Sequence, residues 1–206
     1  MEFVIDVNNL SFDYRVGSFR LRIDEMRVRA GEKIALTGPS GSGKSTLLNV
    51  LAGILSPASG RVEVLGVDVA ALGSEDRQDF RALKMGLVFQ EFELLDYLDL
   101  VDNVLLPWRV SPALRFEKEH KQRAEALLKE SGLGDKLQRR PGSLSQGERQ
   151  RVGVCRALAT GPEIIFGDEP TGNLDAANRD RIMDALFQYS ADAGAALLVV
   201  THDGAL

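Results

Sequence analysis

The chain has 206 residues, of which 44% are hydrophobic and 27% are charged, a composition in the ordinary globular range that suggests neither a fibrous nor a disordered protein. This length fits one domain, or one core with an inserted lobe, and two large independent domains are not expected. With 25 basic against 30 acidic residues, the net charge of -5 argues against a large non-specific nucleic-acid surface, so we expect no nucleic-acid partner.

Three features concern the compartment. Cys155 is the single cysteine, which excludes an internal disulfide, and we expect it to be a small buried side chain in a helix. The first ten residues, MEFVIDVNNL, lack the positive charge and apolar segment of a secretory signal. The longest apolar runs, such as residues 195–200, are far shorter than the roughly 20 residues of a membrane-spanning helix. We therefore expect a cytoplasmic chain that needs another polypeptide to cross any membrane at which it works.

The first part of the chain alternates apolar and polar side chains in places over residues 2–29, which predicts antiparallel strands at one edge of the molecule. A short apolar run at residues 33–37 predicts a buried strand, and glycines separate it from a helix predicted from residue 43 to about residue 55. Residues 60–65 and 85–90 are predicted to form further strands.

The middle of the chain lacks strand signals and places apolar residues at helical spacing, as in residues 116–130. Strands are predicted again at residues 163–166 and 195–201, on either side of a helix over residues 176–190. This alternation is typical of a mainly parallel sheet.

The predicted organisation is a single α/β domain over residues 1–206. Its core comprises about residues 1–90 and 161–206, and an inserted helical lobe comprises about residues 91–160. Tyr97 and Trp108 fall in this lobe, where we expect core packing, with docking to a partner as the alternative.

The sequence GPSGSGKS at residues 38–45 fits the pattern GxxxxGK[ST] and lies between a predicted strand and a predicted helix, as a phosphate-binding loop requires. Glycines let successive backbone N–H groups turn inward around phosphates, and the following helix dipole adds to the attraction. Lys44 is expected to contact the β- and γ-phosphates, Ser45 to coordinate Mg²⁺ and Thr46 to bond the α-phosphate. The predicted phosphate-binding residues are Gly38, Pro39, Ser40, Gly41, Ser42, Gly43, Lys44, Ser45 and Thr46. Kinases, GTPases and many ATPases share this motif.

Two adjacent acids, Asp168 and Glu169, end the apolar stretch that begins at residue 163. Neighbouring positions on a strand point in different directions, so the two carboxylates can take separate roles. We expect Asp168 to hold Mg²⁺ through water and Glu169 to polarise the attacking water. His202 follows the next strand, at the edge where ligands bind in open α/β sheets, and is expected to contact the γ-phosphate. His120, among charged residues, is expected on a solvated helix face.

The sequence LSQGE at residues 144–148, followed by the helical RQRVGVCRAL and then by the two acids, resembles the signature motif of the ABC ATPase family. Gln90 looks like the glutamine of that family's Q-loop, and GNLD at residues 172–175 looks like its D-loop. Tyr14 lies where the family has an aromatic residue that stacks on adenine. The resemblance implies a P-loop NTPase core with an N-terminal antiparallel β subdomain and an inserted α-helical subdomain, and an enzyme that hydrolyses ATP with Mg²⁺.

The same resemblance implies a head-to-tail dimer, in which Ser145 and Gly147 of one subunit cover the γ-phosphate held by Lys44 of the other. It adds Gln90 to the Mg²⁺ ligands Ser45 and Asp168. The implied catalytic residues are Glu169, His202, Gln90 and Lys44. The implied nucleotide-binding residues outside the phosphate loop are Tyr14, Ser145, Gly147, Glu148 and Asp175.

Several alternatives stay open at these positions. Phe12 lies on the same strand face as Tyr14 and is the rival adenine-stacking residue. Asp175 is equally suited to cap the helix that follows it. The family's signature usually has glycine where this chain has Gln146, and members of the family normally continue with more strand and helix beyond the position of Leu206.

Among ABC ATPases, the stretches at residues 86–95, 102–107 and 168–175 look most like the lipoprotein-release, macrolide-export and cell-division group. The leading hypothesis is an ATP-hydrolysing subunit that binds an integral membrane permease, through the segment after Gln90, on the inner face of the cell membrane. The alternatives are a soluble ABC ATPase acting on DNA or ribosomes and a regulatory scaffold with slow turnover. A small-molecule kinase would leave residues 144–148 without a role.

Overall fold

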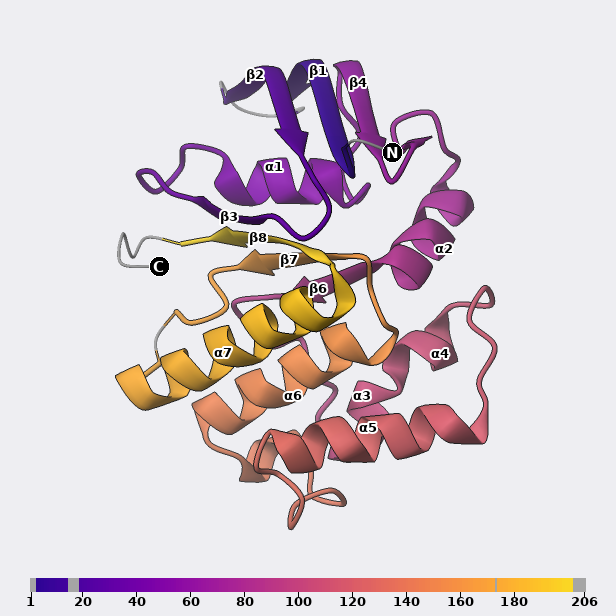
Figure 1. Cartoon of the computed structure of the whole chain (residues 1–206), viewed down its shortest axis with the longest axis vertical. Helices are drawn as coiled ribbons and strands as arrows, with labels where there is room; N and C mark the ends of the chain where they lie inside the picture. The colour runs from indigo at the N-terminus through magenta and orange to yellow at the C-terminus, as the bar shows by residue number, and fades with distance from the viewer. Residues whose placement is uncertain (1–2, 15–18, 173, 202–206) are drawn as a thin grey trace.

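The computed structural model describes residues 3–14, 19–172 and 174–201. Figure 1 shows an antiparallel sheet, a helix beneath it, a second sheet seen edge-on, and further helices below. In chain order the elements are β1 (Ile5–Asp13), β2 (Arg20–Val28), β3 (Lys33–Leu36), α1 (Lys44–Leu51), β4 (Ser59–Val64), β5 (Val67–Asp68), α2 (Ser74–Lys84), β6 (Met85–Val88), α3 (Leu100–Val104), α4 (Leu106–Val110), α5 (Lys118–Glu130), the short 3₁₀ helix η1 (Pro141–Ser143), α6 (Gln146–Ala159), β7 (Ile164–Asp168), α7 (Ala176–Ala193) and β8 (Ala196–Val200).

The antiparallel sheet has the strand order β2-β1-β4-β5 and comes from the first third of the chain. In β1 the buried side chains are first Ile5 and Val7, then Leu10 and Phe12. This alternation shifts by one residue at Asn9, whose φ of 50° lies in the left-handed region, and the pairing with β4 shifts register there. The bulge explains why the apolar pattern in the sequence is regular only in places.

The second sheet is parallel throughout and has the order β3-β8-β7-β6. Its central strands bury both faces, as parallel sheets require. On one face, Phe166 and Leu198 pack with α1 in the cluster that also joins the antiparallel sheet. On the other face, Ile165 and Leu197 pack with α6 and α7. The predicted fold class is therefore confirmed: a mainly parallel α/β core with an antiparallel β sheet and additional helices.

Helices α3 to α6 enclose a third apolar cluster, which lies below the parallel sheet in Figure 1. Trp108 belongs to this cluster and is buried, as expected. Tyr97 is 70% exposed, so the expectation of core packing was wrong for this residue. His120 is half-buried with its ring 4.7 Å from that of Trp108, so its placement on a solvated face was also wrong, because Trp108 packs against it.

In the part of the chain that the structure describes, every helix is too short or too polar to cross a lipid bilayer.

Candidate functional site

The loop between β3 and α1 has the backbone that a phosphate cradle needs. Gly38, Gly41 and Gly43 have φ values of 150°, 77° and 95°, a region that residues with a side chain rarely adopt. Helix α1 begins directly after Gly43 without a side-chain hydrogen bond at its cap. Its first N–H groups are therefore available to an anion at the positive end of the helix dipole.

Lys44 is half-buried and turns back over this loop. Its Nζ donates hydrogen bonds to the carbonyl oxygens of Gly38, at 2.7 Å, and Pro39, at 2.9 Å. The loop thus orients its own cation toward the space that the glycines enclose.

Next to the loop lies a cavity of about 270 Å³, lined by the loop, by α1 and by residues that follow β1, precede β2 and follow β7. Its lining is Tyr14, Phe19, Ser40, Gly41, Gly43, Lys44, Ser45, Thr46 and Glu169. Tyr14 is 44% exposed and its hydroxyl lies 3.0 Å from Oγ1 of Thr46. Phe12, the rival aromatic residue, is only 6% exposed and packs its ring edge against Tyr14. Of these two rings, Tyr14 is the one presented to the cavity.

Ser45 and Asp168 are 123 positions apart in sequence, yet the Ser45 hydroxyl donates a 2.8 Å hydrogen bond to Oδ1 of Asp168. Burial raises the pKa of Asp168 and nearby Glu169 adds to that, whereas the hydrogen bond from Ser45 and the charge of Lys44 lower it. A hydroxyl beside a carboxylate supplies the hard oxygen ligands that Mg²⁺ prefers. The Ser45 hydroxyl and the Asp168 carboxylate therefore fit the predicted Mg²⁺. One of them comes from the phosphate loop and the other from strand β7.

Glu169 follows Asp168 in a left-handed backbone conformation, with a φ of 47°, and its N–H donates to the carbonyl of Val200 at 3.0 Å. Such a φ is uncommon for a residue with a side chain and is often found at functional sites. A Cβ added to Gly172 would lie 3.6 Å from both Oε2 of Glu169 and Nε2 of Gln90, so these two side chains approach the same point. The structure thus brings Gln90 to the edge of the site.

The signature residues gather at the start of α6. Ser145 caps this helix by accepting a hydrogen bond from the N–H of Glu148, whose carboxylate accepts one in return from the N–H of Ser145. Gly147 is buried, and a Cβ there would lie 2.6 Å from the side chain of Asn178. Asn178 in turn is held by Asp175, which caps α7 as one of the two readings predicted. None of these residues lines the cavity beside Lys44.

Residues 21–172 match the model of the family described as ABC transporter. The chain belongs to this family. It is an ABC transporter ATP-binding domain, and the resemblance noted in its motifs is confirmed.

Two relatives of this cassette are named for a lipoprotein-releasing system and for macrolide export. It is 40% identical to the lipoprotein-releasing system ATP-binding protein LolD of Hydrogenovibrio crunogenus, over 98% of this chain and 88% of the relative. It is also 40% identical to the macrolide export ATP-binding/permease protein MacB of Rhodopirellula baltica, over 97% of this chain and 30% of that protein. A dimeric structure of the ATP-binding cassette MJ0796, bound to ADP and Pi, matches with a TM-score of 0.85 at 33% identity, covering 97% of this chain and 88% of that chain.

One predicted site residue, His202, lies outside the described residues. Gln150 and Arg156 on α6 were not predicted: Gln150 bonds the carbonyl oxygens of Phe89 and Pro170, and Arg156 bonds those of Phe92 and Glu93. Both are polar residues within a helix, and nothing in the sequence distinguishes them from solvated ones.

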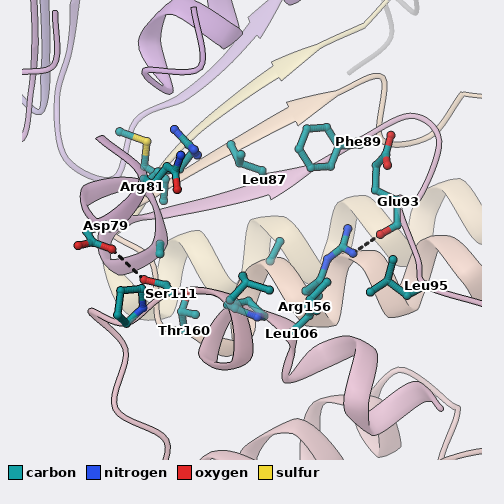
Figure 2. Close-up of a pocket in the computed structure, with 17 residues that line it drawn as sticks. Asp79, Arg81, Leu87, Phe89, Glu93, Leu95, Leu106, Ser111, Arg156 and Thr160 are labelled. Carbon is teal, nitrogen blue, oxygen red and sulfur yellow. Dashed lines mark hydrogen bonds between the residues drawn. The ribbon is translucent and has the colours of Figure 1, made fainter. Parts of the chain in front are cut away.

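A larger cavity, of about 670 Å³, is lined in part by the segment that follows Gln90. Figure 2 shows its lining from β6, α2, α4 and α6, with Arg156 donating to the Glu93 carbonyl and the Ser111 hydroxyl donating to Asp79. Most of its exposed surface is apolar. It borders β6 of the parallel sheet as well as α4 and α6, which contribute to the third apolar cluster.

Proposed function

We propose that this cassette binds and hydrolyses Mg-ATP and, through ATP-driven head-to-tail dimerisation, powers a membrane transporter. The observation that carries the proposal is the 2.8 Å hydrogen bond between Ser45 and Asp168, which joins the phosphate loop to the acidic strand end. Lys44 and Glu169 line one cavity beside this bond. A cation, a pair of metal-binding oxygens and a candidate base are thus gathered within one site.

Nucleotide binding uses the phosphate loop and Tyr14, which directly follows β1. The adenine stacks on the exposed ring of Tyr14, and the phosphates enter the loop of residues 38–46. There Lys44 exchanges its bonds to the Gly38 and Pro39 carbonyls for bonds to the β- and γ-phosphate oxygens. The free N–H groups at the start of α1 contribute to the same anion.

The hydrolytic step falls to the residues at the strand ends. Ser45, Asp168 and Gln90 would hold the Mg²⁺, and the bound ion would neutralise charge that develops on the β- and γ-phosphates. Glu169 accepts a hydrogen bond from the attacking water and polarises it, and the amide of Gln90 lies near enough to Glu169 to orient that water. His202 is proposed to contact the γ-phosphate from the end of β8.

The rest of the site comes from a second copy. Ser145, Gly147 and Glu148 lie at the positive end of α6, where a hydroxyl and a helix dipole suit a γ-phosphate, yet they do not line their own phosphate cavity. A partner cassette, turned head to tail, places them over the nucleotide, with Asp175 at the same interface. The dimeric structure of the MJ0796 cassette, bound to ADP and Pi, supports the dimerisation of such a cassette.

We place the contact with the permease at the cavity beyond Gln90. Exposed apolar side chains lie in this part of the chain: Tyr97 and Val110 are each 70% exposed, and Val110 lines the cavity. Permease binding here puts the cassette on the inner face of the membrane and joins it to the segment that carries Gln90. The names of LolD and MacB support a transport role.

The first test replaces Glu169 by glutamine. The Glu169→Gln variant should bind ATP with wild-type affinity, lose phosphate release by at least about a hundredfold, and accumulate as a dimer with Mg-ATP. Equilibrium ATP binding, phosphate release and light scattering measure these three properties.

The matched control is Glu163→Gln, directly before the same strand, where an exposed glutamate pairs with Lys84. This variant should hydrolyse ATP at the wild-type rate. Loss of activity in both variants would contradict the role of Glu169. A wild type that binds ATP and dimerises without turnover, even with its permease, would favour the regulatory scaffold, for which Gln146 in the signature is the supporting feature.

A further inference from the structure

Gln150 is a buried amide in the second turn of α6, with 1% of its surface exposed. Its Nε2 donates to the carbonyl oxygen of Phe89, at 3.2 Å, and to that of Pro170, at 2.7 Å. Both partners are acceptors, so the orientation of the amide is fixed and its nitrogen must face them. Oε1 of Gln150 is buried and has no hydrogen-bond partner among the described residues.

The two carbonyls belong to the residues next to the proposed hydrolytic side chains. Phe89 directly precedes Gln90, and Pro170 directly follows Glu169. One NH₂ group therefore joins the backbone of β6, where it ends, to the backbone of β7, where it ends. The bonds fix the spacing between the two segments from which Gln90 and Glu169 project.

Stability alone is a poor account of this residue. A buried amide oxygen without a donor lowers stability, whereas an apolar side chain of the same shape leaves no such group. An apolar side chain could not bind the two backbone carbonyls, so the amide serves these particular backbone positions. The role of Gln150 is therefore to position these two backbone segments.

The same helix holds the segment after Gln90 at two further points. The guanidinium of Arg149 lies 5.6 Å from the centre of the Phe92 ring, and Nη2 of Arg156 donates to the Phe92 carbonyl at 2.8 Å. Phe92 and Glu93 have φ values of 38° and 48°, so this segment takes a backbone conformation that needs such support. Helix α6 therefore connects its own N-terminus at Ser145 to the Gln90 segment.

We propose that Gln150 is a positioning residue for ATP hydrolysis, which sets the separation of Gln90 and Glu169 and ties both to the helix that carries the signature residues. The inference rests on the proposed function. Movement of α6, when a partner's nucleotide contacts its N-terminus, is passed through Gln150 to both backbones. ATP binding itself does not depend on Gln150, because Lys44, Ser45 and Tyr14 lie on other elements.

The test is Gln150→Leu, which keeps the approximate volume and removes the donor. We expect kcat to fall about ten- to hundredfold, as for a small misplacement of catalytic groups, while the KM for ATP changes less than about twofold. Assays run below the unfolding temperature of each variant. Gln150→Met, whose flexible side chain fills the same space, replaces the leucine variant should that chain fail to fold.

Ser190→Ala is the matched control. Ser190 is fully buried on α7 and donates to the carbonyl of Ala195 at 2.7 Å, so its loss also removes a buried bond to a backbone oxygen. This variant should lose stability and keep kcat. A Gln150→Leu variant that is destabilised yet retains kcat would overturn the positioning role and leave the proposed function intact. An inactive wild type would instead overturn the proposed function, and the inference with it.

Discussion

Glu148 combines two interactions at the start of α6. Its carboxylate accepts a hydrogen bond from the N–H of Ser145 at 2.8 Å, and it pairs with the ammonium of Lys136. Lys136 is the main reason that the pKa of Glu148 falls from 4.5 to about 2, and the bond from Ser145 adds to it. The charged form of this side chain therefore stabilises the fold.

Replacing Glu148 by glutamine should separate charge from capping, because glutamine also suits the third position of a capping box. A depressed pKa contributes stability that is fully present above about pH 4.5 and is lost as the pH falls toward about 2. Glu148→Gln should therefore be less stable than the wild type at pH 7, and this difference should shrink below pH 4.5. Urea unfolding at pH 7, 5, 4 and 3 measures it.

Lys136→Met provides the background for the control. In a chain without Lys136, the Glu148→Gln substitution should change the unfolding free energy much less, since the main cause of the lowered pKa is gone. A difference between Glu148→Gln and the wild type that stays constant with pH would show that the charge of Glu148 has no part in stability.

Residues that belong to a motif could be predicted from the sequence, including Ser45 and Asp168, which folding brings together, whereas contacts outside any motif could not. The glycines at 38, 41 and 43 have the positive φ values that their pattern indicates. By contrast, Gln150 gave no signal, because its partners Phe89 and Pro170 are 61 and 20 positions away. Their carbonyl groups are common to all residues, so no residue type marks the contact.

At the level of elements, β6 and α6 meet through Gly86. A Cβ at this position would lie 2.6 Å from the carbonyl oxygen of Ala157 and 3.0 Å from the Pro162 ring. Backbone atoms form the closest contact, so a larger residue moves the strand or the helix. The strand that leads to Gln90 and the helix that carries the signature residues are therefore packed at the closest distance the backbone allows.

Gly86→Ala should destabilise the protein by about 1–3 kcal/mol through overpacking. Gly142→Ala is the control, because a Cβ on Gly142 meets nothing within 4 Å and the residue has no positive φ. Denaturant unfolding of both variants measures the effect. Equal stability of Gly86→Ala and the wild type would mean that β6 and α6 can separate slightly without loss.

The elements with a strong apolar pattern were predicted, and those without one were missed. The predicted strand at residues 163–166 and the helix at residues 176–190 correspond to β7 and α7. Helix α2 was not predicted, since no residue of it is fully buried and its sequence has no apolar stripe. The pairing of β4 with β1 was equally hidden, because the two strands are distant in the sequence and their register shifts between Asn8 and Ser11.

For the whole molecule, the decisive feature is that, among the described residues, those at the start of α6 do not line the cavity beside the phosphate loop. If the proposed dimer is correct, mixing two inactive variants that carry different substitutions should restore ATP hydrolysis. Lys44→Ala removes the phosphate-binding ammonium, and Ser145→Asp places a carboxylate against the partner's γ-phosphate while it preserves the helix cap.

Each variant alone should be inactive, and an equimolar mixture should recover about a quarter of the wild-type phosphate release, because half of the random dimers have one intact site. A mixture of Lys44→Ala with Lys44→Ala chains carrying Ser145→Asp should stay inactive and is the control. No recovery in the first mixture, with dimers present, would contradict the head-to-tail arrangement.

The sequence motifs predicted the overall architecture of the part of the chain in which they lie. The order of strand, phosphate loop and helix predicted the parallel core that Figure 1 shows, and the family match over residues 21–172 agrees with it. The division of the buried apolar residues into separate clusters could not be predicted from the sequence. Helix α6 contributes Val152 to the cluster of α3 to α5 and Val154 to that of the sheet, so it belongs to both parts of the molecule.

The burial of Cys155 makes this chain suitable for selective labelling of an introduced cysteine. The side chain is 1% exposed on α6, and burial raises the pKa of its thiol to about 11. At neutral pH the folded protein therefore offers almost no thiolate to a maleimide or an iodoacetamide. A cysteine introduced at an exposed position such as Tyr97 becomes the one site that such reagents label, so fluorophores or spin probes can follow the helices around α3 in the otherwise native sequence.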